Sequence, residues 1–566
     1  MIKKVIEQIK KEKSSVFFVL FLIFLLTIPS FLRMIRPGIF SMHDFHIFRL
    51  FEFHKCISDL VFPCRWAPDS GFAYGEPLFN FYGQFPYILG EPLVLAKLSI
   101  LATIKMLFIF SLFGSAISMF FLTRYLFKSN LAATVSAILY VYAPYRSVDV
   151  WVRGALPESL SFVFFPLILL FFNKYVIEEK RRHLLIFSLV LALLVITHNL
   201  SFFMFLPFLA VWSIYFLTIK KKWSLLKNFV LVSFLTLGLA AFYLLPVIFE
   251  GKLVNLGKTT QDYYNFRAHF TTLNQLLISR IWGYGASQFG PDDKLSFSAG
   301  HLQWILSLLL LVFIAITRKV KKYFLVILFI AFGWFALFLT HGRSLPIWNI
   351  AKSVSFIQFP WRFLTMAALF FAIAEGSVIL FFKNRILRIF VATVIIALTI
   401  GLNFSYFRED LWFNISDKEQ FSGARWQEQI ASAVNDFWPK YAEVVPNSQA
   451  PEIPVFLEGN GKVISFDKKS HSAAADVIVS TETAIVQFPI VYFDGWGSVD
   501  KRISKIYPSG NFGQITASIP QGEHLVSLRL TNTPIRALGN FLSLISVVIL
   551  LVLFLKKNKN SRKNEV

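Results

Sequence analysis

Residues 41–86 read SMHDFHIFRLFEFHKCISDLVFPCRWAPDSGFAYGEPLFNFYGQFP. This stretch follows the first apolar segment and contains three histidines, two arginines, several acids and both cysteines of the protein. Titratable side chains in a mostly apolar chain cost free energy to bury. They therefore mark places where the chain binds a ligand or catalyses a reaction. We therefore expect the chemistry of the protein to take place in this loop.

The surrounding composition is that of a membrane protein. The 566 residues are 56% hydrophobic and 16% charged, which matches no soluble globular class. Many runs approach the ~20 apolar residues that cross a bilayer. The net charge of +23 does not indicate nucleic acid. The Lys and Arg residues form short clusters between apolar runs, which is the pattern that orients membrane helices.

The N-terminal segment sets the orientation. MIKKVIEQIKKEK is basic and precedes an apolar run that ends near Ile28. A retained signal-anchor and a cleaved secretory signal both begin in this way. The bulky Phe31-Leu32-Arg33 favours the anchor, because a cleavage site needs small residues. With this terminus inside the cell, residues 41–86 lie outside.

Eleven later segments predict further membrane helices, about 12–13 in all, and put the basic clusters on the inner side. They span residues 105–127, 131–145, 157–177, 183–198, 200–219, 227–247, 301–317, 323–340, 363–382, 387–403 and 538–556. The apolar stretch 86–104 is left out, because counting it as a span would move the basic clusters outside. We expect an interfacial or re-entrant helix there.

The predicted architecture has three parts. Residues 1–403 form a mainly α, polytopic transmembrane bundle with a large first outer loop at 35–104, residues 404–537 an extracytoplasmic β-rich domain, and residues 538–566 a final helix with a basic cytoplasmic tail. Alternating apolar residues predict strands in the β-rich domain, at 462–466, 476–480, 483–488 and 525–530. This domain, which could be a sandwich, either contacts carbohydrate or caps the bundle.

Asp44 is the first candidate for catalysis. Ser41-x-x-Asp44 fits a capping box, so Asp44 could simply begin a helix. In that helix His43, His46 and Arg49 would share one face, and their side chains can bind phosphate oxygens. A carboxylate beside them can take a proton from an acceptor hydroxyl or bind a divalent cation. A cap alone does not explain these neighbours.

Later outer segments supply further candidates, each with a structural alternative. Arg153 beside a glycine turn suits a phosphate or carboxylate clamp, whereas Glu158 suits the N-terminal dipole of the next helix. His198 and Asn199 mark either a polar cavity or a packed interior. Arg362 could bind a lipid phosphate or merely snorkel.

The outer loop at 248–300 and the cysteines complete the candidates. Tyr284, in Trp-Gly-Tyr-Gly, suits sugar stacking or an interfacial belt, and His301 lies at the entrance of the next helix. Asp292-Asp293 is more typical of a solvated turn than of a metal site. Cys56 and Cys64 are either bonded, which would pin the helix after Asp44, or unpaired.

Several of these motifs resemble a known family. HDFHIFR at 43–49, FPCRWAPDSGFAYGEPLFNFY at 62–82, RGALPE at 153–158, THN at 197–199 and WGYG at 282–285 are similar to a bacterial membrane family labelled "6-pyruvoyl-tetrahydropterin synthase-related". More broadly, the chain resembles the GT-C superfamily of membrane glycosyltransferases. It shows no zinc-binding histidine set of a soluble pterin synthase.

The resemblance implies a fold, a reaction and roles for particular residues. GT-C enzymes transfer a sugar from a polyprenyl-phosphate carrier to an acceptor at the outer membrane face. Asp44 would be the base or a metal ligand, with His46 where a second acid often stands, and Glu158 would be a second catalytic acid. Arg153 and Arg362 would contact the carrier phosphate. A divalent cation, Mg²⁺ or Mn²⁺, would assist if Asp44 and His46 hold one.

We therefore expect a multi-pass cell-membrane glycosyltransferase, inverting at the sugar C1, whose active site faces outward. Its partners would be the lipid bilayer, a polyprenyl-phosphate sugar donor and a glycan, lipid or protein acceptor, with no nucleic acid. Two other functions stay open: a lipid or polysaccharide transporter, and a non-catalytic membrane scaffold with the same fold. No ATP-binding or dinucleotide motif favours an ATP-driven pump.

Overall fold

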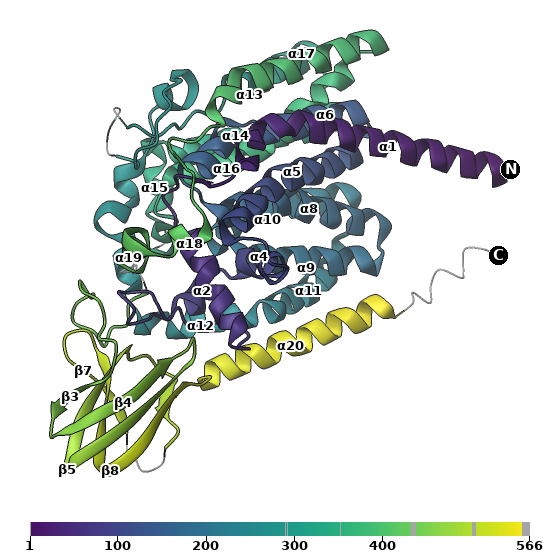
Figure 1. The fold of residues 1–566 in the computed structure, drawn as a ribbon. Helices are drawn as coiled ribbons and strands as arrows, with labels where there is room; N and C mark the ends of the chain where they lie inside the picture. Colours follow the sequence, from purple (N-terminus) through teal and green to yellow (C-terminus); the bar gives the residue numbers. More distant parts are fainter. Residues whose placement is uncertain are drawn as a thin grey trace.

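The computed structural model describes residues 2–556, except residues 289, 291–292, 351, 432–436 and 501–504. A bundle of helices carries an antiparallel β-domain at one end (Figure 1). The N-terminus and the end of the last long helix lie together at the other end of the bundle (Figure 1). The sequence predicted that the basic N-terminus and the end of the last helix lie on the same, inner side of the membrane. The fold agrees with this prediction.

The chain is a multi-pass membrane protein. Eight helical segments among the described residues are long and apolar enough to cross a bilayer. Five of them are single helices: α5 (Ile100–Phe127), α8 (Leu156–Glu178), α10 (Asn199–Lys220), α14 (Val320–Thr340) and α20 (Pro534–Leu555). The other three include 3₁₀ turns: α1 (Ile2–Phe31) and α17 (Arg385–Asn403) each continue into one, and α16 (Leu364–Gly376) has one at each end.

The predicted helices are all present, but fewer have the length of a span than the sequence pattern suggested. α6 (Asn130–Val141), α9 (Arg181–Thr197) and α13 (His301–Ile316) have 12, 17 and 16 residues. α6 was expected to reach residue 145. It ends early because Pro144 lies ahead, and the residue before a proline avoids helical geometry.

One predicted span, 227–247, is broken. α11 (Leu226–Leu239) and α12 (Ala241–Glu250) belong to a helix pair bent by 76°. Ser543 of α20 satisfies backbone groups freed by the bend, because its hydroxyl accepts from Phe242 N at 2.9 Å and donates to Gly238 O at 2.9 Å. Such compensation is what permits irregular backbone at membrane depth. The bend directs α12 toward the first loop.

The first loop folds into three short helices, α2 (His46–Ser58), α3 (Leu78–Phe81) and α4 (Phe85–Leu95). α4 has 11 residues, or about 16 Å of helix, roughly half the thickness of a hydrocarbon core. This length agrees with its exclusion from the spans. Before α2, strand β1 (Ile39–Phe40) pairs with β2 (Trp412–Phe413), which follows α17. Four smaller helices complete this end: α7 (Pro144–Ser147), α15 (Leu345–Trp348), α18 (Asp417–Gln420) and α19 (Gly423–Ala431).

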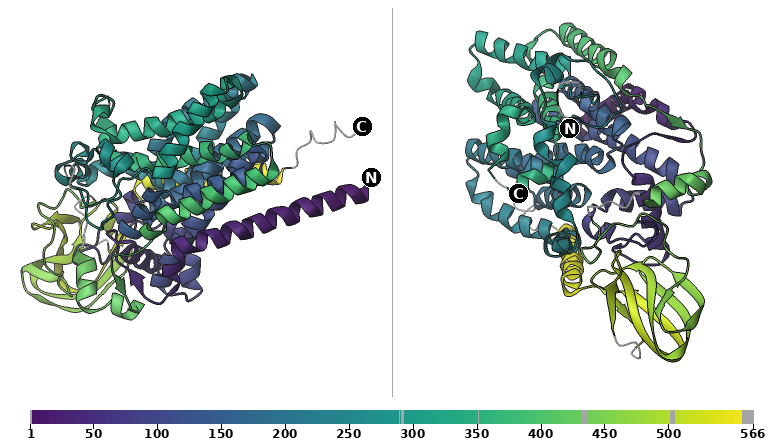
Figure 2. Two further views of the ribbon diagram at one scale, coloured as in Figure 1. Left: turned by 90° about the horizontal axis from the view of Figure 1, so that it is seen from above. Right: turned by 90° about the vertical axis from the view of Figure 1, so that its left-hand side faces the viewer.

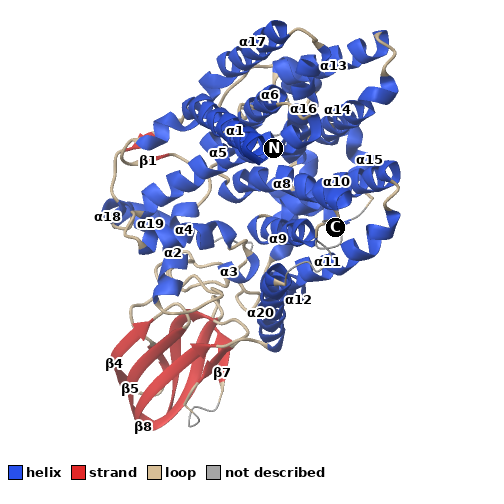
Figure 3. Ribbon diagram, turned by 90° about the vertical axis from the view of Figure 1, so that its right-hand side faces the viewer, coloured by secondary structure: helices blue, strands red, loops and turns tan. Residues whose placement is uncertain are grey.

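The β-domain is a single antiparallel sheet and not a sandwich. Two long strands form its centre, β5 (Ser472–Val491) and β8 (Gln514–Leu530). β3 (Val455–Glu458) and β4 (Gly461–Lys468) pair with β5, while β6 (Trp496–Ser498) and β7 (Ile506–Ser509) pair with β8. The strands predicted at 476–480 and 483–488 are one strand with a register shift between them. Figure 3 shows this sheet in red, apart from the helices.

The β-domain rests against the first loop. Ser470 donates from its main-chain nitrogen and its hydroxyl to Asp59 at 2.8 and 2.6 Å, and Trp66 meets Trp496 edge to face. The left view of Figure 2 shows the sheet projecting from the end of the bundle opposite the N-terminus. The first loop is therefore held between the helix bundle and the sheet.

Candidate active site

Two cavities meet at the first loop. The larger has a volume of about 790 Å³ and the smaller one of about 230 Å³. Six residues line both of them: His43, Asp44, Arg153, Ala155, Tyr264 and Phe359. Asp44 is the only acid in this shared set. A group bound in either cavity can therefore face the same carboxylate.

Asp44 is held just before α2 and does not cap it. Its main-chain nitrogen donates to Arg153 O at 3.2 Å, and the helix begins two residues later, at His46. Carboxylate Oδ1 accepts from Arg49 at 2.6 Å, and Oδ2 lies 3.1 Å from His46 Nε2. Ser41 instead accepts from Leu411 N, so the capping box does not form. The carboxylate remains 30% exposed.

The neighbours of Asp44 keep it ionised. Burial alone would raise its pKa, but the charges and hydrogen bonds of His46 and Arg49 hold that pKa well below its usual range. His46 is fully buried, and burial lowers its own pKa. Its Nδ1 lies 2.9 Å from the Tyr87 hydroxyl, so both ring nitrogens are occupied. His43 precedes the helix and contacts Tyr284 O. It therefore does not share a helical face with His46 and Arg49.

Arg153 joins the first loop to the start of α8. One guanidinium nitrogen contacts Tyr145 at 3.1 Å, Asp149 at 3.0 Å and Glu158 at 2.8 Å. Gly154 follows with φ +63°, and a Cβ there would lie 2.4 Å from Met42 Cβ. Glycine at 154 therefore permits both the turn and the close approach of the first loop.

The Glu158 carboxylate is held by neighbouring side chains at the start of α8. Its carboxylate is completely buried. Oε1 accepts from Tyr145 at 2.7 Å and from Thr365 at 3.0 Å, while Oε2 accepts from Arg153. Arg362 Nε lies 3.7 Å from Oε2. With its oxygens engaged in this way, Glu158 orients two arginines.

A polar group of side chains lines the larger cavity opposite the first loop. Arg362 is anchored by hydrogen bonds to Ile357 O and Gln358 and stays 8% exposed. His198 and Asn199, at the start of α10, line the same cavity. Burial lowers the pKa of His198 to about 3, so this imidazole is neutral at physiological pH. Arg153 and Arg362 line this cavity together with the neutral side chains of His198 and Asn199. This combination suits a phosphate group.

Much of the remaining wall of the larger cavity is apolar. α10 contributes Leu200, Phe202 and Phe203, and α12 contributes Val247 and Ile248. Ile248 is 64% exposed and Phe203 37% exposed. Apolar side chains that belong to membrane helices and are open on one side suit contact with lipid. The larger cavity thus has a charged end at Asp44 and an apolar end between α10 and α12.

The smaller cavity is lined by aromatic and small residues of the outer loop. Tyr263, Gly285, Ser287 and Trp361 complete its wall. Ser287 is fixed in place, because it donates to Asp293 at 3.1 Å and accepts from Trp361 Nε1 at 3.2 Å. Aromatic faces beside a polar carboxylate suit a sugar or another polyol.

Two predicted binding residues line neither cavity. The Tyr284 hydroxyl donates to Arg408 O and Glu409 O, so its ring is turned away and only its carbonyl meets His43. The His301 ring contacts Ile278 O at 3.0 Å at the start of α13. Asp293 is engaged within the loop by Leu295 N and Gln288 N, and Asp292 lies outside the described residues.

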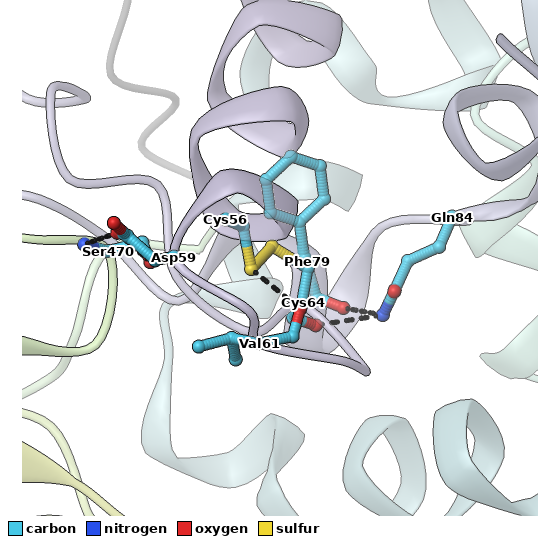
Figure 4. The surroundings of a disulfide bond; sticks show 7 residues. All are labelled: Cys56, Asp59, Val61, Cys64, Phe79, Gln84 and Ser470. Atoms are coloured by element: carbon cyan, nitrogen blue, oxygen red, sulfur yellow. Dashed lines mark hydrogen bonds between the residues drawn. A yellow bond between two sulfur atoms is a disulfide. The ribbon is translucent and has the colours of Figure 1, made fainter. Parts of the chain in front are cut away.

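The cysteines of the first loop form a disulfide. Cys56 and Cys64 are bonded at a sequence separation of eight residues. Figure 4 shows the bond at the end of α2, close to the contact of Asp59 with Ser470. The cross-link therefore ties the far end of the helix that carries His46 and Arg49 to the chain that leads to α3.

The family model for the 6-pyruvoyl-tetrahydropterin synthase related domain, described as a membrane protein, matches residues 79–408. The chain belongs to this family. This confirms the family resemblance seen in the sequence motifs. The family match contains Arg153, Glu158, His198 and Arg362, whereas Asp44 and the β-domain lie outside it.

Other comparisons add little to the family assignment. The crystal structure of the Archaeoglobus fulgidus oligosaccharyltransferase, tethered with an acceptor peptide, is similar at 14% sequence identity and a TM-score of 0.40. The likeness covers 76% of this chain and 59% of that chain. A similarity of this size supports no conclusion about the present protein. No curated protein matches the chain.

Sequence patterns missed the aromatic and apolar wall of the site in this family member. Tyr82, Tyr264, Phe359 and Trp361 all line a cavity. Among 66 Phe, 18 Tyr and 13 Trp, no local pattern separates these rings from core residues. Gly83 was also missed. A Cβ there would lie 2.4 Å from Thr197 O, which reveals a close contact of the first loop with the turn before α10.

The residues predicted as metal ligands do not fit a divalent cation. The described residues contain no group of three His, Cys, Asp or Glu side chains that could hold a metal, and Asp44 is the only acid that lines both cavities. Both ring nitrogens of His46 are occupied, and a guanidinium lies against Asp44. We therefore derive no step of the reaction through a metal.

Proposed function

We propose that this membrane protein transfers a sugar from a polyprenyl-phosphate carrier to an acceptor hydroxyl on the outer side of the membrane. The observation that carries the proposal is the position of Asp44, which lines both cavities at once. A transferase needs its two substrates to meet at one reactive group in a near-attack geometry.

The larger cavity suits the lipid-linked donor. Its apolar end, with Phe203 and Ile248, can hold the first isoprene units. Its charged end, with Arg153 and Arg362, can hold the phosphate. Among the described residues, Glu158 is the only other acid in the wall of this cavity, and its carboxylate is buried against the arginines. Asp44 is therefore the only partly exposed carboxylate in the described wall near the phosphate. The sugar on the phosphate would then point toward Asp44.

The smaller cavity suits the acceptor. Tyr263, which is 46% exposed, offers a face for a sugar ring or an equivalent polar acceptor. An acceptor hydroxyl there attacks C1 of the donor sugar, and the C1–O bond to phosphate breaks. The hydroxyl proton passes to Asp44, and the bond electrons leave on the phosphate, whose charge the arginines stabilise. Attack from the face opposite the phosphate inverts C1.

The test is sugar transfer by the purified protein in lipid nanodiscs, with labelled undecaprenyl-phosphate sugars. We expect transfer by the wild type and at least a 100-fold loss in Asp44→Asn. Asp410→Asn is the matched control, because Asp410 is an exposed acid beyond α17. Equal rates in the wild type and Asp44→Asn would refute the role of Asp44. Absence of transfer with every donor would favour a scaffold.

A further inference from the structure

Arg49 occupies the position beside Asp44 that a bound cation would need. Its guanidinium lies 2.6 Å from Asp44 Oδ1 and 4.1 Å from the centre of the Tyr82 ring. The side chain is 6% exposed. The backbone of Arg49 belongs to the first turn of α2, where its main-chain nitrogen donates to Phe45 O at 3.0 Å. Arg49 therefore has a fixed position in the site and is not a mobile surface charge.

The second oxygen of Asp44 is engaged as well. Oδ2 lies 3.1 Å from His46 Nε2, and Oδ1 also accepts from Phe45 N at 3.0 Å. A dication bound through both carboxylate oxygens would have to displace Arg49 or His46. It would then lie among Arg49, Arg153 and Arg362, which all line the same cavity. Like charges at these distances disfavour entry of a second cation.

We propose that Arg49 is the resident cation of this site and that the protein works without a divalent metal ion. The fixed guanidinium neutralises Asp44, orients its free lone pairs toward the cavities and keeps the carboxylate ionised. Arg153 and Arg362 supply the positive charge for the phosphate. Arg49 acts through Asp44 and is in this sense a positioning residue. Its effect on transfer rests on the proposed function, whereas the exclusion of a metal ion does not.

Metal binding is measured first, without any sugar donor. Protein stripped with EDTA is titrated with Mn²⁺, and free Mn²⁺ is followed by electron paramagnetic resonance. We expect no stoichiometric binding at micromolar Mn²⁺ in either the wild type or Asp44→Asn. One bound Mn²⁺ per chain in the wild type that is lost in Asp44→Asn would overturn the proposal. This result is independent of whether any donor has been found.

Transfer is measured second, once a donor is known. We expect the wild type to keep its rate in EDTA and Arg49→Met to lose at least 100-fold. Methylguanidinium at millimolar concentration should restore part of the Arg49→Met activity, and Arg49→Lys should be intermediate. In Arg49→Met the acid limb of the pH–rate profile should move to higher pH, which lost folding alone would not cause. Loss of wild-type activity in EDTA, reversed by Mn²⁺, would refute the proposal.

Discussion

The main-chain nitrogen of Asp44 donates to the main-chain oxygen of Arg153, 3.2 Å away. These two residues are 109 positions apart and come from the first loop and the turn before α8. Their backbone contact places the carboxylate of one and the guanidinium of the other on the wall of the same two cavities. The site is therefore assembled by backbone pairing between loops, and its side chains are oriented by buried partners.

Glu158→Gln should destabilise the protein more than its position in a cavity wall suggests. The buried carboxylate of Glu158 compensates Arg153 and Arg362, and removing one partner of a buried ion pair costs about 3–5 kcal/mol. The measurement is the thermal unfolding midpoint in detergent. Glu179→Gln is the control, because Glu179 pairs with Lys222 at the surface, where such pairs contribute about 0–1 kcal/mol. Equal midpoints for the two variants would contradict the positioning role.

Arg362→Gln should weaken donor binding more than it affects the fold, because Glu158 keeps its closer partner Arg153. Arg362 lines the larger cavity and is held by Ile357 O and Gln358. Loss of one charge-assisted contact to phosphate costs about 1.5–3 kcal/mol, so KM for the donor should rise roughly 10–100-fold. Arg343→Gln, at an exposed turn after α14, should leave KM unchanged. An unchanged KM in Arg362→Gln would remove this residue from the phosphate site.

The acid stability of the protein should depend on Asp44. Its pKa in the folded protein lies well below the usual value, so the folded carboxylate binds a proton less readily than the unfolded one, whose pKa is about 3.9. The resulting stability is present above about pH 4 and is lost as pH falls through the folded pKa. The gap in unfolding midpoint between the wild type and Asp44→Asn should therefore be constant at pH 5–7 and shrink below pH 4. A gap that widens in acid would show that the pKa of Asp44 is not depressed.

Most of the architecture could be predicted from the sequence. Long apolar runs and basic clusters are strong, local signals, and they predicted the helices, the β-domain and the loop that carries Asp44. The shortening of α6 has a local cause, because Pro144 follows closely in the sequence. The break at residue 240 instead came from an interaction between distant segments, the contact with Ser543 of α20.

The candidate site was predictable only in part, for the same reason. Charged and polar residues stand out in an apolar chain, so the sequence singled out Asp44, Arg153, His198 and Arg362 as candidates, and all four line the larger cavity. Whether a charge is a catalyst or a support depends on its buried partners. In the sequence, Glu158 fits either role. Only the structure shows that Tyr145, Thr365 and Arg153 donate to its carboxylate. No spacing rule in the sequence brings those groups together.

The disulfide should stabilise the first loop by a modest amount. Cys56 and Cys64 close a loop of nine residues, counting both ends, for which chain entropy predicts about 2.5 kcal/mol. A reductant should therefore lower the unfolding midpoint of the wild type by about 2 °C. The Cys56→Ser/Cys64→Ser variant should start at the lower midpoint and show no response to reductant. A response in the double variant would mean that the reductant acts elsewhere.

Ile248→Asp should separate the lipid part of donor recognition from the chemistry at Asp44. Ile248 lies in the apolar end of the larger cavity and is 64% exposed, so the substitution need not disturb the packed core. A carboxylate there would lie where we place the isoprene chain, and burying it against lipid is unfavourable. KM for an undecaprenyl donor should rise at least 10-fold, while a short-chain, water-soluble donor analogue should be used as well as by the wild type. Leu525→Asp, on an exposed position of β8, is the control for an added surface charge. If the variant loses activity equally with long and short donors, the apolar end of the cavity does not bind the carrier chain, and the donor must approach Asp44 by another route.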